Sequence, residues 1–177
     1  MNITIDNLTL RPLESNDASA FFDLIDRNRI RLRDYFPVTI SVITNLENCK
    51  RYIEEKAEQA LIREHYCYVI ADKQSRLLGL IILKNIDWRV PKGELAYFID
   101  KDYEGKGITS RALSALVSYC FDTMEMNKLF ILTAVDNHPS RKLAEKTGFE
   151  TEGILRKNFR LSDGRLVDNV YYGLLRK

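Results

Sequence analysis

A chain of 177 residues, with 45% hydrophobic and 29% charged side chains, can bury a substantial core, which excludes a largely disordered protein. Its net charge of +2 gives no general reason to expect a nucleic acid or a membrane as partner. The three cysteines, Cys49, Cys67 and Cys120, are widely spaced and predict neither a metal site nor a disulfide framework.

The N-terminal third of the chain is predicted to form one strand and two helices. The alternating segment LTLRPL (8–13) is typical of a strand, and SNDASAFFDLIDRN (15–28) combines capping residues with helical spacing. Residues 46–65 are predicted to form the second helix. The basic stretch RNRIRLR (27–33) is interpreted as a solvated helix face rather than a nucleic-acid site.

Three strands are predicted next. YCYVIAD (66–72) and LLGLIIL (77–83) are joined by a short polar turn, which indicates an antiparallel hairpin. The continuous apolar run in ELAYFID (94–100) predicts a strand that is buried on both faces.

Helices and strands then alternate. Apolar residues from Ile108 to Met124 fall on one helical stripe, KLFILTAV (128–135) reads as a buried strand, and PSRKLAEKTG (139–148) as a short helix. Because strands 94–100 and 128–135 enclose a helix, we expect them to be parallel.

The two ends of the chain complete this interpretation. Residues 149–161 and 165–175 flank an SDG turn and predict a closing hairpin. The N-terminus has no basic-then-apolar signal pattern, and no apolar run approaches the length of about 20 residues that a membrane helix needs. We therefore expect a cytoplasmic protein with a single domain over residues 1–177.

The segment YEGKGITSR (103–111) places two glycines directly before the long helix. A strand, a glycine turn and a helix start present unpaired backbone N–H groups and the positive end of a helix dipole, which suit a phosphate. Ser110 stands where G-x-G-x-x-G requires its third glycine, and no G-x-x-x-x-G-K-[ST] loop is present. A plain turn that starts the helix is the alternative interpretation.

Together with VDNHPSRKLAEKTGFETEGILR (135–156), this loop resembles the GNAT superfamily of acyl-CoA-dependent N-acyltransferases. The superfamily's cofactor loop, [QR]-x-x-G-x-[GA], is similar to residues 104–109, where Gly107 matches while Glu104 and Thr109 differ. The distal segment, with LTLRPL, RIRLRDYFP and NIDW, resembles the branch that acetylates N-terminal alanine or serine of ribosomal proteins. The matching distal positions are Asn137, Ser140, Leu143, Glu145, Lys146, Gly148, Phe149, Glu152, Gly153 and Arg156.

The resemblance implies an α/β (α+β) architecture, the GNAT fold. Its centre is a mixed, mostly antiparallel twisted sheet of about seven strands with a splayed parallel pair and about four helices. It also implies acetyl-CoA as co-substrate. The positions that carry over are Phe98, Ile99 and Asp100 on the strand, Glu104, Gly105, Lys106, Gly107, Ile108 and Thr109 in the loop, and Asn137 and Ser140 near the last helix start. Capping of that helix is an equally good interpretation of Asn137, and Lys106 is typical of a solvated side chain.

The implied reaction is direct attack of an amine on the acetyl thioester in a ternary complex. By resemblance, Glu94 is the candidate base acting through water, and Ser140 helps to protonate the leaving thiolate; a charged strand end is the plain alternative for Glu94. The tyrosine that many members use for the thiolate falls on Ala144 here, and a second acidic residue of some members falls on Phe159.

The acceptor is expected to be the N-terminal α-amine of a protein such as a ribosomal protein. An α-amine has a pKa of about 7.7–8.0 against about 10.4 for lysine, so it is partly neutral without a strong base. The resemblance and the aromatic, arginine-bearing segments place the acceptor near Arg33, Tyr35, Phe36 and Trp88.

Two alternative functions stay open. The acceptor could be a small-molecule amine such as a polyamine, amino acid or antibiotic, or the protein could be a non-catalytic acyl-CoA-binding module. We expect no nucleic acid or membrane partner, and a monomer or homodimer.

Overall fold

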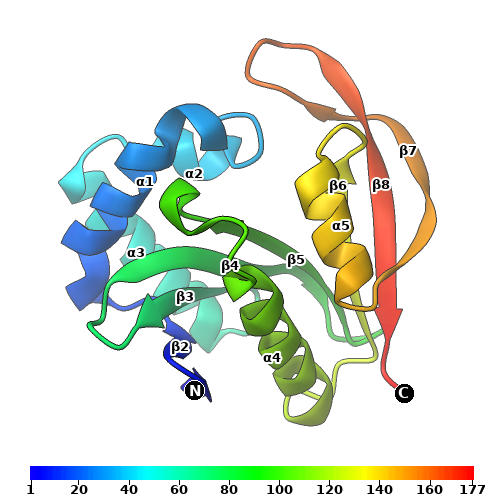
Figure 1. Cartoon of the computed structure of the whole chain (residues 1–177), viewed down its shortest axis with the longest axis horizontal. Helices are drawn as coiled ribbons and strands as arrows, with labels where there is room; N and C mark the ends of the chain where they lie inside the picture. Colours follow the sequence, from blue (N-terminus) through cyan, green and yellow to red (C-terminus); the bar gives the residue numbers. More distant parts are fainter.

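An eight-stranded sheet in the order β1-β2-β3-β4-β5-β6-β8-β7 forms the centre of the protein, in a computed structural model that describes residues 1–177 (Figure 1). The strands are β1 (Ile3–Ile5), β2 (Leu8–Pro12), β3 (Tyr66–Asp72), β4 (Leu77–Asp87), β5 (Lys92–Ile99), β6 (Lys128–Ala134), β7 (Glu150–Arg160) and β8 (Leu166–Leu175). The helices are α1 (Ala18–Leu32), α2 (Pro37–Val42), α3 (Leu46–Leu61), α4 (Ile108–Asp122) and α5 (His138–Lys146), with short 3-10 turns at Ser15–Asp17 and Lys101–Tyr103.

The predicted parallel pair is confirmed in β5 and β6, and all other neighbouring strands are antiparallel. The two parallel strands pair only between Lys92–Glu94 and Lys128–Phe130, and they diverge beyond Glu94. Because β5 stays paired with β4, and β6 with β8, each strand loses its partner on one side only. The sheet therefore opens into a wedge between β5 and β6, with free backbone groups along its edges.

Two hydrophobic cores lie on opposite faces of the sheet (Figure 1). Side chains of α4 and α5, such as Leu113 and Ala144, pack into the first core, whereas α1 and α3 contribute Phe21 and Ile53 to the second. Residues that alternate along β5 supply both cores, Leu95 the first and Phe98 the second. This two-sided burial explains why the strand reads as a continuous apolar run.

The sequence predicted about seven strands and four helices, and the structure corrects these numbers to eight and five. The additional elements are β1, a three-residue edge strand, and α2, a six-residue helix that begins at Pro37. Neither is long enough to show a period in a window of about 11 residues. No helix of the protein combines the length and the apolar character needed to cross a membrane.

Candidate active site

A cleft of about 700 Å³ borders the divergence of β5 and β6, within the range of about 300–1,000 Å³ typical of small-molecule sites. The end of α1, the end of β5, the glycine loop and the start of α5 form its walls. We call it the α4–α5 cleft. Of the predicted cofactor-binding residues, the cleft brings together Phe98, Ile99, Glu104, Gly105, Gly107, Ile108, Thr109, Asn137 and Ser140.

The glycine loop leaves backbone exposed at one end of this cleft. Gly105 and Gly107 have φ angles of +71° and +69°, a region that residues with a Cβ rarely adopt. No atom lies within 4 Å of the Cβ that either glycine would carry, so the space beside the loop is open. Gly107 is the N-cap of α4, and no side chain caps this helix. The free N–H groups and the helix dipole therefore fit a phosphate group.

The free edge of β5 forms a second wall of the cleft. The amide of Asp100 donates to the carbonyl of Leu78 on β4 at 2.7 Å. Because backbone groups alternate in an antiparallel pair, those of Ile99 and Tyr97 face the wedge instead. An extended ligand arm can pair with these groups like an added strand. Tyr97, which was not predicted, thus takes the backbone role expected of Phe98, whose side chain is packed in the second core.

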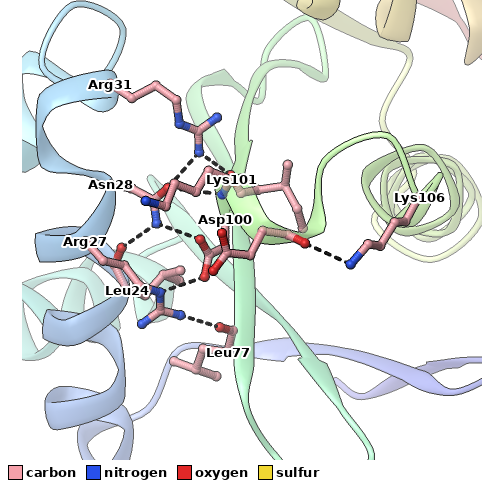
Figure 2. Close-up of polar contacts among 10 residues, drawn as sticks. Leu24, Arg27, Asn28, Arg31, Leu77, Asp100, Lys101 and Lys106 are labelled. Carbon is pink, nitrogen blue, oxygen red and sulfur yellow. Dashed lines mark hydrogen bonds and ion pairs between the residues drawn. The ribbon is translucent and has the colours of Figure 1, made fainter.

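A polar network ties α1 to the end of β5 (Figure 2). Arg27 Nε donates to Asp100 Oδ2 at 2.6 Å, and Asn28 Nδ2 donates to Asp100 Oδ1 at 3.2 Å. Burial raises the pKa of Asp100, but these hydrogen bonds outweigh burial and hold the pKa below its ordinary value. The Asp100 side chain is 1% exposed and fixes β5 against α1, so its position gives no support to the expected cofactor contact.

Arg31 extends the network into the cleft. Its guanidinium donates to Asn28 Oδ1 at 2.9 Å (Figure 2). The same group donates to the Ile99 carbonyl and forms an ion pair with Glu104. Glu104 is the acidic departure from the superfamily loop pattern, and a cation from α1 compensates its charge. Lys142 and Lys146, one turn apart on α5, line the cleft as exposed cations. Cations of this kind favour phosphate binding.

A second cavity, of about 270 Å³, adjoins the cleft. Five residues line both spaces, which therefore meet at the wedge: Tyr35, Phe36, Tyr97, Asn137 and Ser140. The remaining lining comes from Lys84 on β4, from β5 and β6, and from the β7–β8 hairpin with Asn158, Phe159 and Asn169. We call it the hairpin cavity.

Glu94 lies at the apex of the wedge and lines the hairpin cavity. It is 6% exposed, and its carboxylate accepts a hydrogen bond from Asn85 Nδ2 at 2.7 Å. Lys84 Nζ lies 3.3 Å from the other carboxylate oxygen. The sequence placed Glu94 and Ser140 together as candidate catalytic residues, and the structure does bring both to one cavity.

Ser140 meets Tyr97 where the two spaces join. The Tyr97 hydroxyl lies 3.1 Å from the Ser140 carbonyl and 3.2 Å from Ser140 Oγ. Burial raises the pKa of Tyr97 to about 12, although the Ser140 hydrogen bond acts in the opposite direction, so the phenol keeps its proton near neutral pH. Asn137 Oδ1 accepts from Ser140 N at 3.3 Å, which confirms the capping interpretation of Asn137.

A polar bridge joins the β7–β8 hairpin to the segment that precedes Tyr35. Ser162, at the tip of the β7–β8 hairpin, donates from its backbone N to Asp34 Oδ1 at 3.2 Å and also from its hydroxyl. Asp34 directly precedes Tyr35 and Phe36, which line the cavity beneath. The helical side and the hairpin side of the cavity are therefore joined.

Besides Asp100, three predicted site residues line neither space. Lys106 points away: its Nζ donates to the Asp102 carbonyl at 2.8 Å and lies 4.7 Å from the ring centre of Tyr103. Arg33 is exposed at the end of α1. Trp88 lies in the β4–β5 turn, where Nε1 donates to the Arg63 carbonyl at 2.8 Å and the Arg63 guanidinium stacks 3.8 Å from the ring centre. These positions give no support to the expected ligand contacts.

The open mixed sheet, whose one parallel pair diverges beside a glycine loop, is the fold that the sequence resemblance implied. The chain belongs to the GNAT acetyltransferases: the family model for the acetyltransferase (GNAT) domain matches residues 7–150. Its relatives carry N-acetyltransferase names, and the protein is an N-acetyltransferase.

The chain is 32% identical to "Putative ribosomal N-acetyltransferase YdaF" of Bacillus subtilis (strain 168), over 97% of this chain and 93% of that protein. It is 28% identical to a spermidine N(1)-acetyltransferase of Vibrio cholerae serotype O1, over 91% of this chain and 88% of that protein. The solved structure of the ribosomal L7/L12 α-N-protein acetyltransferase RimL with coenzyme A gives a TM-score of 0.91 at 21% identity, covering 99% of this chain and 98% of that one. This last likeness shows the fold.

Proposed function

We propose that the protein transfers the acetyl group of acetyl-CoA to the α-amine at the N-terminus of a protein or peptide, a ribosomal protein being the leading candidate. One observation carries the proposal: the α4–α5 cleft and the hairpin cavity meet at Tyr97 and Ser140 through the wedge. A thioester entering from one side and an amine from the other would react directly, because alignment alone removes much of the barrier.

The α4–α5 cleft fits acetyl-CoA, which supplies an activated acetyl thioester. The bare loop at Gly105 and Gly107 suits the pyrophosphate, and the free edge at Tyr97 and Ile99 suits the extended arm. Lys142 and Lys146 add positive charge beside the phosphates. The solved structure of RimL contains coenzyme A, and RimL has the same fold as this chain. This likeness supports the proposal.

Side chains at the meeting point can move the two protons that the reaction requires. Glu94 accepts the proton of the attacking amine through solvent, since its carboxylate lines the acceptor side. Tyr97 donates to the Ser140 carbonyl, which leaves the Ser140 hydroxyl proton for the departing thiolate. A backbone N–H on the free edge of β5 is the donor we assign to the developing oxyanion.

The hairpin cavity favours a neutral α-amine over a polycation. Its only carboxylate is that of Glu94, and Lys84 lies 3.3 Å away. A polyamine carries several ammonium groups and requires several carboxylates, whereas an α-amine loses its proton near pH 8 unaided. Polyamine acetylation is nevertheless the second candidate, because a spermidine acetyltransferase is among the relatives.

The test is acetyl-CoA turnover with a panel of peptides, spermidine and an aminoglycoside, read by thiol release and by mass spectrometry of the products. Peptides with a small, free N-terminal residue should be acetylated faster than spermidine. Blocking the N-terminus of the same peptide should abolish the reaction even when an internal lysine is present. Faster acetylation of spermidine than of every peptide would overturn the proposed acceptor while leaving the enzyme class intact.

A further inference from the structure

Asn169 on β8 is a buried polar residue without a partner for its amide oxygen. The residue is 4% exposed, and Oδ1 accepts no hydrogen bond. Native proteins satisfy nearly all buried polar atoms, because an orphaned one loses its water and gains nothing in return. An unpaired amide in the wall of a cavity therefore points to a group that arrives from outside.

The position of Asn169 places that group in the hairpin cavity. Asn169 lines the hairpin cavity, opposite Ala134 of β6 and on the cavity that also contains Glu94. The oxygen is closed to solvent in the free protein, so water does not stabilise it there. The terminal torsion of asparagine is broad, so the amide can rotate when a ligand group occupies the cavity that Asn169 lines.

We infer that Asn169 binds the first peptide group of the acceptor, with Oδ1 accepting its N–H, and thereby selects peptides over simple amines. This inference rests on the proposed function. The attacking α-amine lies next to the wedge, and the peptide group that follows it is two bonds further into the hairpin cavity. A side-chain amide complements a peptide group in both donor and acceptor, whereas spermidine has no peptide group to offer.

Asn169→Leu separates this role from a structural one. The native oxygen makes no hydrogen bond in the free protein, so an apolar side chain of similar size should leave the melting temperature unchanged or raise it. The peptide KM should rise roughly three- to tenfold, the value of one neutral hydrogen bond. The kcat and the KM for acetyl-CoA should stay within about twofold, as expected when uniform binding is removed. Asn7→Leu, the same change in the exposed β1–β2 turn, is the matched control.

A change in the acceptor tests the same contact from the other side. An otherwise identical peptide with an ester in place of its first amide lacks the N–H but keeps the carbonyl. Wild type should bind this ester three- to tenfold less well than the amide, whereas Asn169→Leu should hardly distinguish the two. Equal discrimination by both proteins would overturn the inference, and so would an unchanged peptide KM in Asn169→Leu.

The two levels of the proposal can fail separately. If wild type acetylates peptides but the ester substitution and Asn169→Leu have no coupled effect, only the role of Asn169 falls. If wild type acetylates spermidine and no peptide, the proposed acceptor and the role of Asn169 both fall. A large drop in melting temperature of Asn169→Leu would show instead that the amide stabilises the fold.

Discussion

The starts of α4 and α5 border the same cleft but are built in opposite ways. α4 begins at Gly107 in a left-handed conformation with no side-chain cap, so its first backbone N–H groups are free. α5 begins with Asn137, whose side chain accepts from Ser140 N, and with Pro139, which has no N–H. The first helix therefore presents backbone groups to the cleft, whereas the second presents side chains such as Ser140 and Lys142.

Under the proposed function, this difference assigns binding to one helix start and chemistry to the other. The free backbone N–H groups of an uncapped helix start can bind any anionic ligand. Binding there depends on the backbone conformation that glycine permits, and not on a particular side chain. A capped start holds its own residues still and so fixes the hydroxyl of Ser140 beside Tyr97. Substitutions at the two starts should consequently alter different kinetic constants.

The largest effect is expected from Gly107→Val. A β-branched residue at φ +69° strains the backbone by about 1–3 kcal/mol, and relieving the strain moves the free amides, so the Kd for acetyl-CoA should rise up to about 100-fold. Calorimetry measures the change. Gly164→Val is the matched control, because Gly164 also has positive φ and open space but lies in the hairpin turn. Equal affinity in wild type and Gly107→Val, with both folded, would remove the loop from the cofactor site.

Ser140→Ala should affect chemistry rather than binding. Loss of the proposed proton donor to the thiolate should lower kcat by roughly 10- to 100-fold. This loss is at or below the low end of the rate contribution that general acids typically make. The Kd for acetyl-CoA should stay nearly unchanged. Tyr97→Phe should show a smaller loss of the same kind, since it removes the group that orients Ser140. Single-turnover kinetics with a fixed peptide distinguishes the two. A normal kcat for Ser140→Ala would reduce Ser140 to a residue of the helix start.

The ion pair between Arg31 and Glu104 should tune the uncapped start of α4. Both side chains are partly exposed, so the effects are limited to those of a surface pair, about 1 kcal/mol at most. Arg31→Leu leaves Glu104 uncompensated and should weaken acetyl-CoA binding about two- to fivefold, and Glu104→Gln should strengthen it slightly. In the Glu104→Gln background, Arg31→Leu should no longer weaken binding, because the charge that it leaves uncompensated is gone; a titration at low salt measures this coupling. Equal weakening by Arg31→Leu with and without Glu104→Gln would mean that the pair does not act on the cofactor.

The smallest functional effect is expected from Asn137→Ala, at the capped start. Removing this N-cap should lower the free energy of unfolding by about 1 kcal/mol, which a thermal melt detects. The affinity for acetyl-CoA should change by less than about twofold, because the cap serves the helix. A loss of affinity comparable to that of Gly107→Val, with unchanged stability, would contradict the division between the two helix starts.

Local patterns predicted most of the fold, because each long element carries its own period. The position of β5 was predicted from the apolar run of 94–100, and that of the loop from the glycines of 103–111. The helix enclosed between two strands predicted the parallel pair, which the structure confirms. The sequence pattern could not reveal β1 or α2, because each is too short for a hydrophobic period to repeat within it.

The missed site residues depend on contacts between distant segments. Arg31 looked like part of a solvated basic face, and only the approach of α1 to β5 brings it to Glu104. Tyr97 could have been selected from the period of two that links it to Ile99 on the free edge. The sequence does not show which way the Trp88 side chain points, and in the structure it packs on Arg63 and lines neither space.

If the acceptor enters the hairpin cavity beside the bridge between Ser162 and Asp34, the bridge determines how a chain can enter. A rim that is open on one side admits a chain from the flank, including the middle of a loop, but a rim closed by a bridge forms a ring. Only something with an end can thread a ring: a polypeptide terminus or one extended side chain. Selection against interior segments would then be a property of the entrance's connectivity, independent of any contact that recognises the amine.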